Sequence, residues 1–137
     1  MRRLFLLAPL FAALAACSTP PAQPAASGER PIPRLGRMEE TGRRLYVSVC
    51  AYCHGTLGDG FGLNATNLPV PPRDHTDSAY MNRLTDEQLV ALIKFGGAAQ
   101  GKSASMPPWA GRFNDREIAA LVAYLRILAC CSGQARR

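Results

Sequence analysis

Apolar residues recur at helical spacing in three stretches of the chain. The first runs from about Glu39 to Ala51, the second follows Thr85 and the third follows Asn114. The positions that carry the spacing are Leu45, Tyr46 and Val49, then Leu89, Leu92 and Ile93, then Ile118, Leu121, Val122, Leu125 and Leu128. A period near 3.6 predicts amphipathic helices. No run of alternating β-branched residues predicts a strand, so we expect an all-α fold with three main helices.

Local signals mark the ends of the second and third helices. Residues 85–88 read Thr-Asp-Glu-Gln, which has the spacing of a capping box, and Gly96 and Gly97 follow the last apolar position of that helix. Asn114 precedes the third helix with Glu117 at the N3 position. These signals predict helices that begin near residues 85 and 114.

The connections between the predicted helices are long and rich in Gly and Pro. They cover about residues 55–62, 69–72 and 96–108. Loops of this length are uncommon in a small domain unless they serve a function. We expect them to wrap around a large cofactor.

The first residues have the pattern of a secretory signal, which we assign to residues 1–16. Arg2 and Arg3 precede an apolar stretch from Leu4 to Leu14. That stretch is shorter than the roughly 20 apolar residues of a membrane span. We therefore expect export of the mature protein without a membrane-spanning helix.

The signal ends in Leu-Ala-Ala followed by Cys17, which resembles the lipobox of bacterial lipoproteins. The resemblance implies that Cys17 becomes the new N-terminus and carries acyl chains, of which two already give stable anchoring. The alternative is an ordinary cysteine near a signal-peptidase site. Length, flanks and the small residues before Cys17 favour the lipid anchor.

Residues 17–37 form the predicted linker, and residues 38–129 the predicted domain. The linker is rich in Pro, Ala, Ser and Thr, so it favours extended conformations that bury no core. A tail over residues 130–137 follows the third helix and begins with Cys130 and Cys131. These two cysteines have three open interpretations: a vicinal disulfide, a bond to another chain, or free thiols.

The net charge of +6 comes from the flanks of the chain. Between residues 38 and 129 the basic and acidic side chains are equal in number. A basic face with interleaved aromatic residues is missing from the pattern, so nucleic-acid binding is not expected.

Residues 50–54 read Cys-Ala-Tyr-Cys-His, the C-x-x-C-H form of a haem attachment site. On a helical turn, the sulfurs of Cys50 and Cys53 share one face, where they can reach one porphyrin edge, and His54 can reach the iron. A C-x-x-C pair also occurs in redox dithiols and zinc sites. A thioredoxin-like site needs a βαβ context, and zinc needs further ligands, for which only His75 and distant cysteines are available.

Together these motifs resemble class I cytochrome c domains over residues 38–129. The motifs occur in the order of that family. They are Gly42 to Tyr46 leading into Cys50 to Gly55, the Gly58-Asp59-Gly60 loop, Pro71 to Asp74, Ser105 to Trp109, and Tyr124 to Arg126.

The resemblance implies a cytochrome c fold around one haem c, attached through Cys50 and Cys53 with His54 as the proximal ligand. The family takes its sixth iron ligand from a Met in the loop before the last helix, and Met106 matches that position. Met38 and Met81 are poorer candidates, because one opens the first helix and the other lies in a polar stretch. His75 is the alternative ligand, although similar sequences often carry Phe there, which favours a partly exposed packing role.

Further roles follow from the same resemblance. A carbonyl within residues 69–72 is expected to accept a hydrogen bond from His54. Arg73 and Trp109 are expected near the haem propionates. Gly42 is expected to allow close contact with the region of Tyr124.

The function implied is one-electron transfer, by a mobile carrier or by a cytochrome subunit of a respiratory or dehydrogenase complex. The alternative is a haem enzyme or gas-binding sensor with an open sixth iron position. The expected partners are redox proteins or a membrane respiratory complex. The lipid anchor places the domain at a bacterial membrane, facing the periplasm or the cell exterior.

Overall fold

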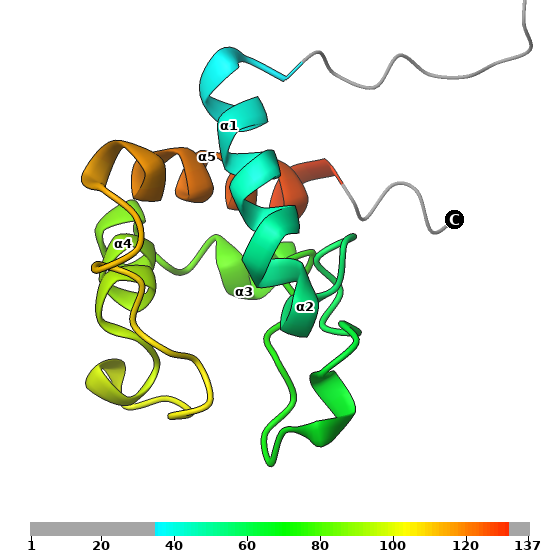
Figure 1. The fold of residues 1–137 in the computed structure, drawn as a ribbon. Helices are drawn as coiled ribbons and strands as arrows, with labels where there is room; N and C mark the ends of the chain where they lie inside the picture. The colour runs from blue at the N-terminus through cyan, green and yellow to red at the C-terminus, as the bar shows by residue number, and fades with distance from the viewer. Residues whose placement is uncertain (1–34, 132–137) are drawn as a thin grey trace, which may run out of the picture. The chain divides into compact units, whose positions relative to one another are not determined.

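The computed structural model describes residues 35–131, and every regular element within that range is helical. The elements shown in Figure 1 are α1 (Arg37–Leu45), a π-helical turn (Tyr46–Cys50), α2 (Ala51–His54), a 3₁₀ turn (Ala65–Asn67), α3 (Ser78–Met81), α4 (Asp86–Phe95), a second 3₁₀ turn (Ala98–Gln100) and α5 (Asp115–Cys131). The predicted all-α fold class is confirmed.

Several predictions fall outside the described residues. These are the signal over residues 1–16, the lipidation site Cys17, almost all of the linker and most of the tail. They remain predictions. Within residues 35–131, no helix combines the length and the apolar character that crossing a membrane requires.

The first predicted helix is longer than expected and changes its winding along the way. Helix α1 begins at Arg37, and the helical course continues through a π turn and α2 to His54. In the π turn, the Ala51 N–H donates to the Tyr46 carbonyl, an i→i+5 bond. The apolar periodicity does not predict such a turn, because residues 46–50 contain no Gly or Pro that would mark a change in winding.

The predicted caps of α4 and α5 are confirmed. The Thr85 hydroxyl accepts from the Gln88 N–H, and the Gln88 side-chain oxygen accepts from the Thr85 N–H at 2.8 Å. Asn114 and Glu117 make the same reciprocal pair at 3.0 and 2.9 Å. Each pair satisfies N–H groups that a helix start leaves without intrahelical partners.

Helix α5 continues further than expected, through Cys130 and Cys131. These cysteines were expected just past the helix. The helix continues because the buried Leu128 and Ala129 extend its apolar face and no Gly or Pro interrupts it. The Cys130 side chain is exposed and its thiol is free.

Helix α1 packs across α5 at a glycine. A Cβ atom on Gly42 would overlap the backbone of Ala120 and lie 2.9 Å from the Cβ atom of Tyr124. The expected close contact between Gly42 and the Tyr124 region is therefore present. This contact fixes the crossing from which the π turn and α2 extend.

Met81 belongs to the hydrophobic core, with only 1 % of its surface exposed. It was expected in a polar stretch, and the short helix α3 was not predicted. The Asp77 side chain accepts from the Tyr80 N–H at 3.0 Å and caps α3, which turns Met81 inward. Tyr46, Ile118 and Leu121 are buried to the same degree in this core.

Polar contacts join α4 and α5. Lys94 near the end of α4 forms a 2.7 Å ion pair with Asp115 at the start of α5. The Arg126 guanidinium donates to the carbonyls of Met81 and Leu84 at 2.8 and 2.6 Å. In Figure 1, α4 and α2 lie apart, with α5 running across above both. The candidate site lies between these elements.

Candidate functional site

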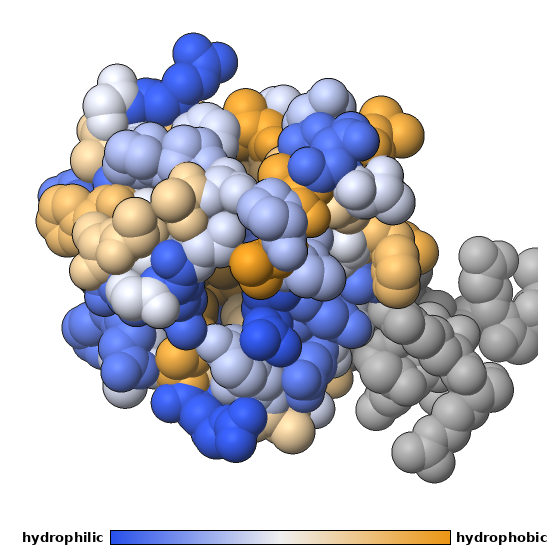
Figure 2. All heavy atoms as spheres, turned by 90° about the horizontal axis from the view of Figure 1, so that it is seen from below, coloured by the Kyte–Doolittle hydropathy of each residue, from blue (hydrophilic) through white to orange (hydrophobic). Residues whose placement is uncertain are grey.

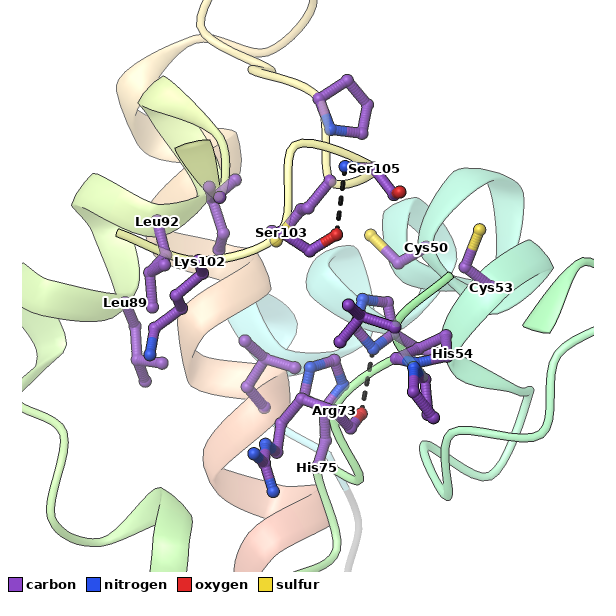
Figure 3. Close-up of a pocket in the computed structure, with 18 of the residues that line it drawn as sticks. Cys50, Cys53, His54, Arg73, His75, Leu89, Leu92, Lys102, Ser103 and Ser105 are labelled. Carbon is purple, nitrogen blue, oxygen red and sulfur yellow. Dashed lines mark hydrogen bonds between the residues drawn. The ribbon is translucent and has the colours of Figure 1, made fainter. Parts of the chain in front are cut away.

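The C-x-x-C-H motif lies where the first helical segment ends. Cys50 is the last residue of the π turn, and Cys53 and His54 lie in α2. Gly55, with a φ of 80°, ends α2 in a conformation that a side chain would strain. Both cysteines are half-buried with free thiols and line one pocket together with His54. Figure 3 shows the two sulfurs on the same side of this pocket.

The thiol chemistry differs from that of a redox dithiol. Burial, followed by the nearby Cys53, raises the pKa of the Cys50 thiol to about 12. A reactive dithiol needs a lowered thiol pKa, because the thiolate is the nucleophile. No three His, Cys, Asp or Glu side chains within residues 35–131 are grouped to share a metal ion, as a structural zinc site requires.

His54 is oriented by a backbone carbonyl. Its Nδ1 lies 3.0 Å from the carbonyl oxygen of Arg73, and the dashed line in Figure 3 marks this bond. A carbonyl only accepts, so Nδ1 carries the proton and Nε2 keeps its lone pair for a metal. Burial lowers the pKa of His54, and the Arg73 bond opposes this in part. The acceptor is Arg73, one residue beyond the expected range of 69–72.

Glycine loops hold the Arg73 segment in place. The Gly60 N–H donates to the His54 carbonyl at 2.8 Å, and the His75 N–H donates to the Gly58 carbonyl at 2.7 Å. Gly60 has a φ of 83°, and a Cβ atom there would lie 2.9 Å from the Pro72 carbonyl oxygen. The Gly58-Asp59-Gly60 motif thereby positions the carbonyl that orients His54.

His75 lies beside His54. The two rings stack with centroids 4.2 Å apart and planes 20° apart. Two imidazoles that bind opposite sides of one iron point at it end-on from both sides, whereas these rings lie face to face. The arrangement is that of a packing neighbour, which agrees with the expected role of His75 and disfavours bis-His ligation.

Met106 reaches the pocket from the loop between α4 and α5. The Gly97 N–H donates to the Met106 carbonyl at 2.9 Å, and the Trp109 N–H donates to the Ile93 carbonyl at 3.0 Å. These bonds hold the loop against the end of α4. The Met106 side chain is half-buried and lines the same pocket as the motif cysteines and His54. Met38, by contrast, is half exposed on α1 and does not line the pocket.

The pocket measures about 340 Å³ and is mainly apolar. This volume lies within the range of roughly 300–1,000 Å³ that small-molecule sites occupy. Leu89 and Leu92 of α4 lie across the pocket from the cysteines in Figure 3. Figure 2 shows a hollow with hydrophobic residues inside it and a rim of both hydrophilic and hydrophobic residues.

Basic side chains line the pocket without an acidic counterpart. Arg73 and Lys102 are among the lining residues, and no Asp or Glu is. The Lys102 ammonium donates to the Tyr80 hydroxyl at 3.1 Å, and the Arg73 guanidinium lies 3.9 Å from the centre of the Tyr80 ring. The pKa of Tyr80 is lowered, mainly by the Lys102 bond. Tyr80 and Lys102 were not predicted from the sequence, because they lie 22 residues apart and share no motif.

Trp109 also lines the pocket, where its ring stacks on that of Phe113 at 5.6 Å. Arg73 and Trp109 were both expected near haem propionates. Of these two, Arg73 carries a charge that can pair with carboxylates, and it lies with Lys102 around Tyr80. Trp109 carries no such charge.

The side chains that line the pocket fit haem c. Two free thiols on one side of the pocket suit thioether formation, and a neutral imidazole with a committed Nδ1 suits iron. The Met106 thioether suits the iron, the apolar walls suit the porphyrin, and two cations that share the pocket lining with no Asp or Glu suit the haem carboxylates. The residues predicted from the motif, Cys50, Cys53, His54 and Met106, all line this one pocket.

Comparisons with known proteins agree with this assignment. The family described as "Cytochrome C oxidase, cbb3-type, subunit III" matches residues 37–125. The chain is also similar to the cbb3-type cytochrome c oxidase subunit FixP of Bradyrhizobium diazoefficiens, with 27 % identity over 95 residues. That similarity covers 69 % of this chain and 29 % of the relative, so the chain spans less than a third of that protein.

Among solved structures, the chain is similar to one in the reducing HAO-like protein complex of Kuenenia stuttgartiensis. The TM-score is 0.57 at 22 % identity, covering 77 % of this chain and 50 % of the other. At this identity the likeness establishes the fold alone. The family match spans well over half of the sequence and includes the C-x-x-C-H motif and the Met106 loop. This chain therefore belongs to the cbb3-type oxidase subunit III family of c-type cytochrome domains, a family that binds haem c covalently.

Proposed function

We propose that this chain is a one-electron carrier with a single haem c attached to Cys50 and Cys53. In this proposal His54 and Met106 would hold the haem iron. The observation that carries it is the convergence of all four side chains on one apolar pocket, with Nδ1 of His54 already committed to the Arg73 carbonyl.

The side chains of the pocket have separate tasks. Bound haem c supplies an iron that gains and loses one electron. His54 presents Nε2, because its Nδ1 proton is held by Arg73. The Met106 thioether would be a soft donor to the iron, which would favour the reduced state and leave no room there for a substrate. Arg73 and Lys102 line the same pocket and would balance the negative charge of the haem carboxylates.

We further propose that the partner is a redox protein or a membrane respiratory complex. The family description and the FixP relative both name a cytochrome c oxidase subunit, which supports such a partner. Acylated Cys17 and the extended linker would hold the domain at a bacterial membrane, facing the periplasm or the cell exterior. A tagged full chain can be purified from membranes in mild detergent. Copurification with a stable complex would favour a subunit, and purification without one would favour a mobile carrier.

An absorption spectrum of protein made in a host that matures c-type cytochromes tests the proposal. We expect a c-type pyridine haemochrome with one haem per chain. The oxidised protein should show the far-red sulfur-to-iron charge-transfer band, which Met106→Ala should abolish. Met38→Ala is the matched control, because Met38 lies outside the pocket, and should keep the band.

A haem enzyme or gas-binding sensor is the competing function, and it requires an open iron position. Carbon monoxide binding to the reduced wild type distinguishes the two functions. We expect little binding in wild type and strong binding in Met106→Ala. Equal binding in both proteins, with no charge-transfer band in wild type, would reject Met106 as a ligand and favour the competing function.

A further inference from the structure

The buried Tyr46 and the half-buried His75 form a polar pair next to the candidate iron ligand. The Tyr46 hydroxyl lies 3.1 Å from Nδ1 of His75, and the His75 ring stacks on His54. Tyr46 in turn makes an edge contact with Tyr124 of α5, with centroids 5.3 Å apart. A continuous series of aromatic contacts thus connects α5 to His54.

We propose that His75, held by Tyr46, is a positioning residue that sets the plane of the His54 ring. This inference rests on the proposed function, in which His54 is an iron ligand. The role goes beyond haem attachment, because neither Tyr46 nor His75 would bind the iron.

The Arg73 carbonyl alone does not fix the His54 plane. The terminal torsion of a histidine side chain is broad, and one hydrogen bond restrains one atom of the ring. The ring plane can still tilt while Nδ1 stays within hydrogen-bonding distance of the Arg73 carbonyl. A second ring stacked on its face at 4.2 Å blocks that tilt. The two contacts together define both the direction and the plane of the imidazole.

His75 is itself held from two directions. Its backbone N–H donates to the Gly58 carbonyl at 2.7 Å, and its ring faces the hydroxyl of Tyr46. Tyr46 is 1 % exposed and comes from the π turn, next to the crossing at Gly42. The restraint on His54 therefore comes from the most buried part of the fold.

Simple packing does not account for the polar pair. A phenylalanine at position 75 could stack on His54 equally well, without placing polar atoms in the interior. Burying a polar group without a hydrogen bond costs free energy, and the pair supplies that bond. What His75 adds over phenylalanine is a directional bond that fixes the rotation of its own ring.

The test compares haem-loaded full-length variants by the proton NMR of the oxidised protein. In a low-spin ferric haem, the plane of an axial imidazole governs how the unpaired spin is distributed, and the haem-methyl resonances report that distribution. Tyr46→Phe removes only the hydroxyl, and His75→Phe keeps a stacking ring. Tyr52→Phe is the matched control, because it removes a hydroxyl within the motif from a side chain that is 58 % exposed.

We expect Tyr46→Phe and His75→Phe each to redistribute the haem-methyl resonances, while Tyr52→Phe leaves them unchanged. The double variant should resemble His75→Phe alone, because both changes act through one contact. An unchanged haem-methyl pattern in folded His75→Phe and Tyr46→Phe proteins would overturn the inference. Failure of the proposed function is distinguishable, because wild type would then lack a low-spin spectrum with the methionine band.

Discussion

Gly42 of α1 lies directly against the backbone carbonyl of Ala120 in α5. No other residue type fits, because any Cβ atom would overlap that backbone. The contact brings the two helices close enough for Tyr46 to reach Tyr124. The geometry of the haem pocket therefore depends on the absence of a side chain at a position outside it.

We expect Gly42→Ala to lower the free energy of unfolding of the haem-loaded protein by about 1–3 kcal/mol. Alanine favours a helix interior by about 0.5–1 kcal/mol over glycine, but a clash with backbone cannot relax by a side-chain rotation. Denaturant titration monitored by circular dichroism measures the change. Gly111→Ala is the control, since nothing lies within 4 Å of a Cβ atom there. Equal stability of the two variants would contradict the prediction.

The stability of the protein should fall in mild acid because of His75. Burial, followed by the nearby His54 and Arg73, holds the pKa of His75 well below its ordinary 6.5. The folded protein thus binds fewer protons than the unfolded chain, and unfolding takes up protons as the pH drops below 6.5. The contribution is fully present above that pH and is lost as the pH falls toward the folded pKa. Denaturant titrations at about pH 7.5 and about pH 5 should show a smaller loss for His75→Phe than for wild type. An equal loss of stability in both proteins would rule out His75 as its cause.

Arg126 should stabilise the corner between α3 and α4 mainly through its backbone bonds. Arg126→Met removes the guanidinium donor from the Leu84 carbonyl and one of two donors from the Met81 carbonyl, which also accepts from the Leu84 N–H at 3.2 Å. We expect a loss of about 1–3 kcal/mol in the free energy of unfolding. Asp86→Asn removes only the ion pair, whose carboxylate side is 64 % exposed, and should cost less than about 1 kcal/mol. A larger effect of Asp86→Asn in denaturant titration would show that the ion pair dominates.

Membrane attachment should depend on Cys17. We expect Cys17→Ala to move the protein from the membrane fraction to the soluble fraction of lysed cells, because it removes the site of acylation. Cys130→Ala is the matched control and should stay with the membrane. If Cys17→Ala still fractionates with membranes, the anchor lies elsewhere.

Local chemistry explains what the sequence predicts well. The reciprocal bonds at Thr85 and Asn114 involve residues three positions apart, so they can be recognised without knowledge of the rest of the fold. The motif at residues 50–54 is local in the same sense. Met106 could be assigned only through the resemblance to a family, because the other residues of the candidate site, at positions 50–54, lie far away in the chain.

Features that depend on contacts between distant parts of the chain were not predicted from the sequence. The bond partner of His54 was expected one residue too early, because the position of that segment is set by the bond between His75 and Gly58. Met81 was misjudged because its polar neighbours conceal the short helix that Asp77 caps. The stacking of His75 on His54 joins residues from two segments, and no linear pattern records it.

Arg73 performs two tasks with two different parts of one residue. Its carbonyl orients His54, while its guanidinium lies over Tyr80 at the pocket. Every amino acid supplies a backbone carbonyl. A substitution at position 73 can therefore change the charge beside the haem and keep the hydrogen bond to His54. The redox properties of such a domain can therefore evolve at this position independently of iron ligation, through side-chain changes that leave the fold intact.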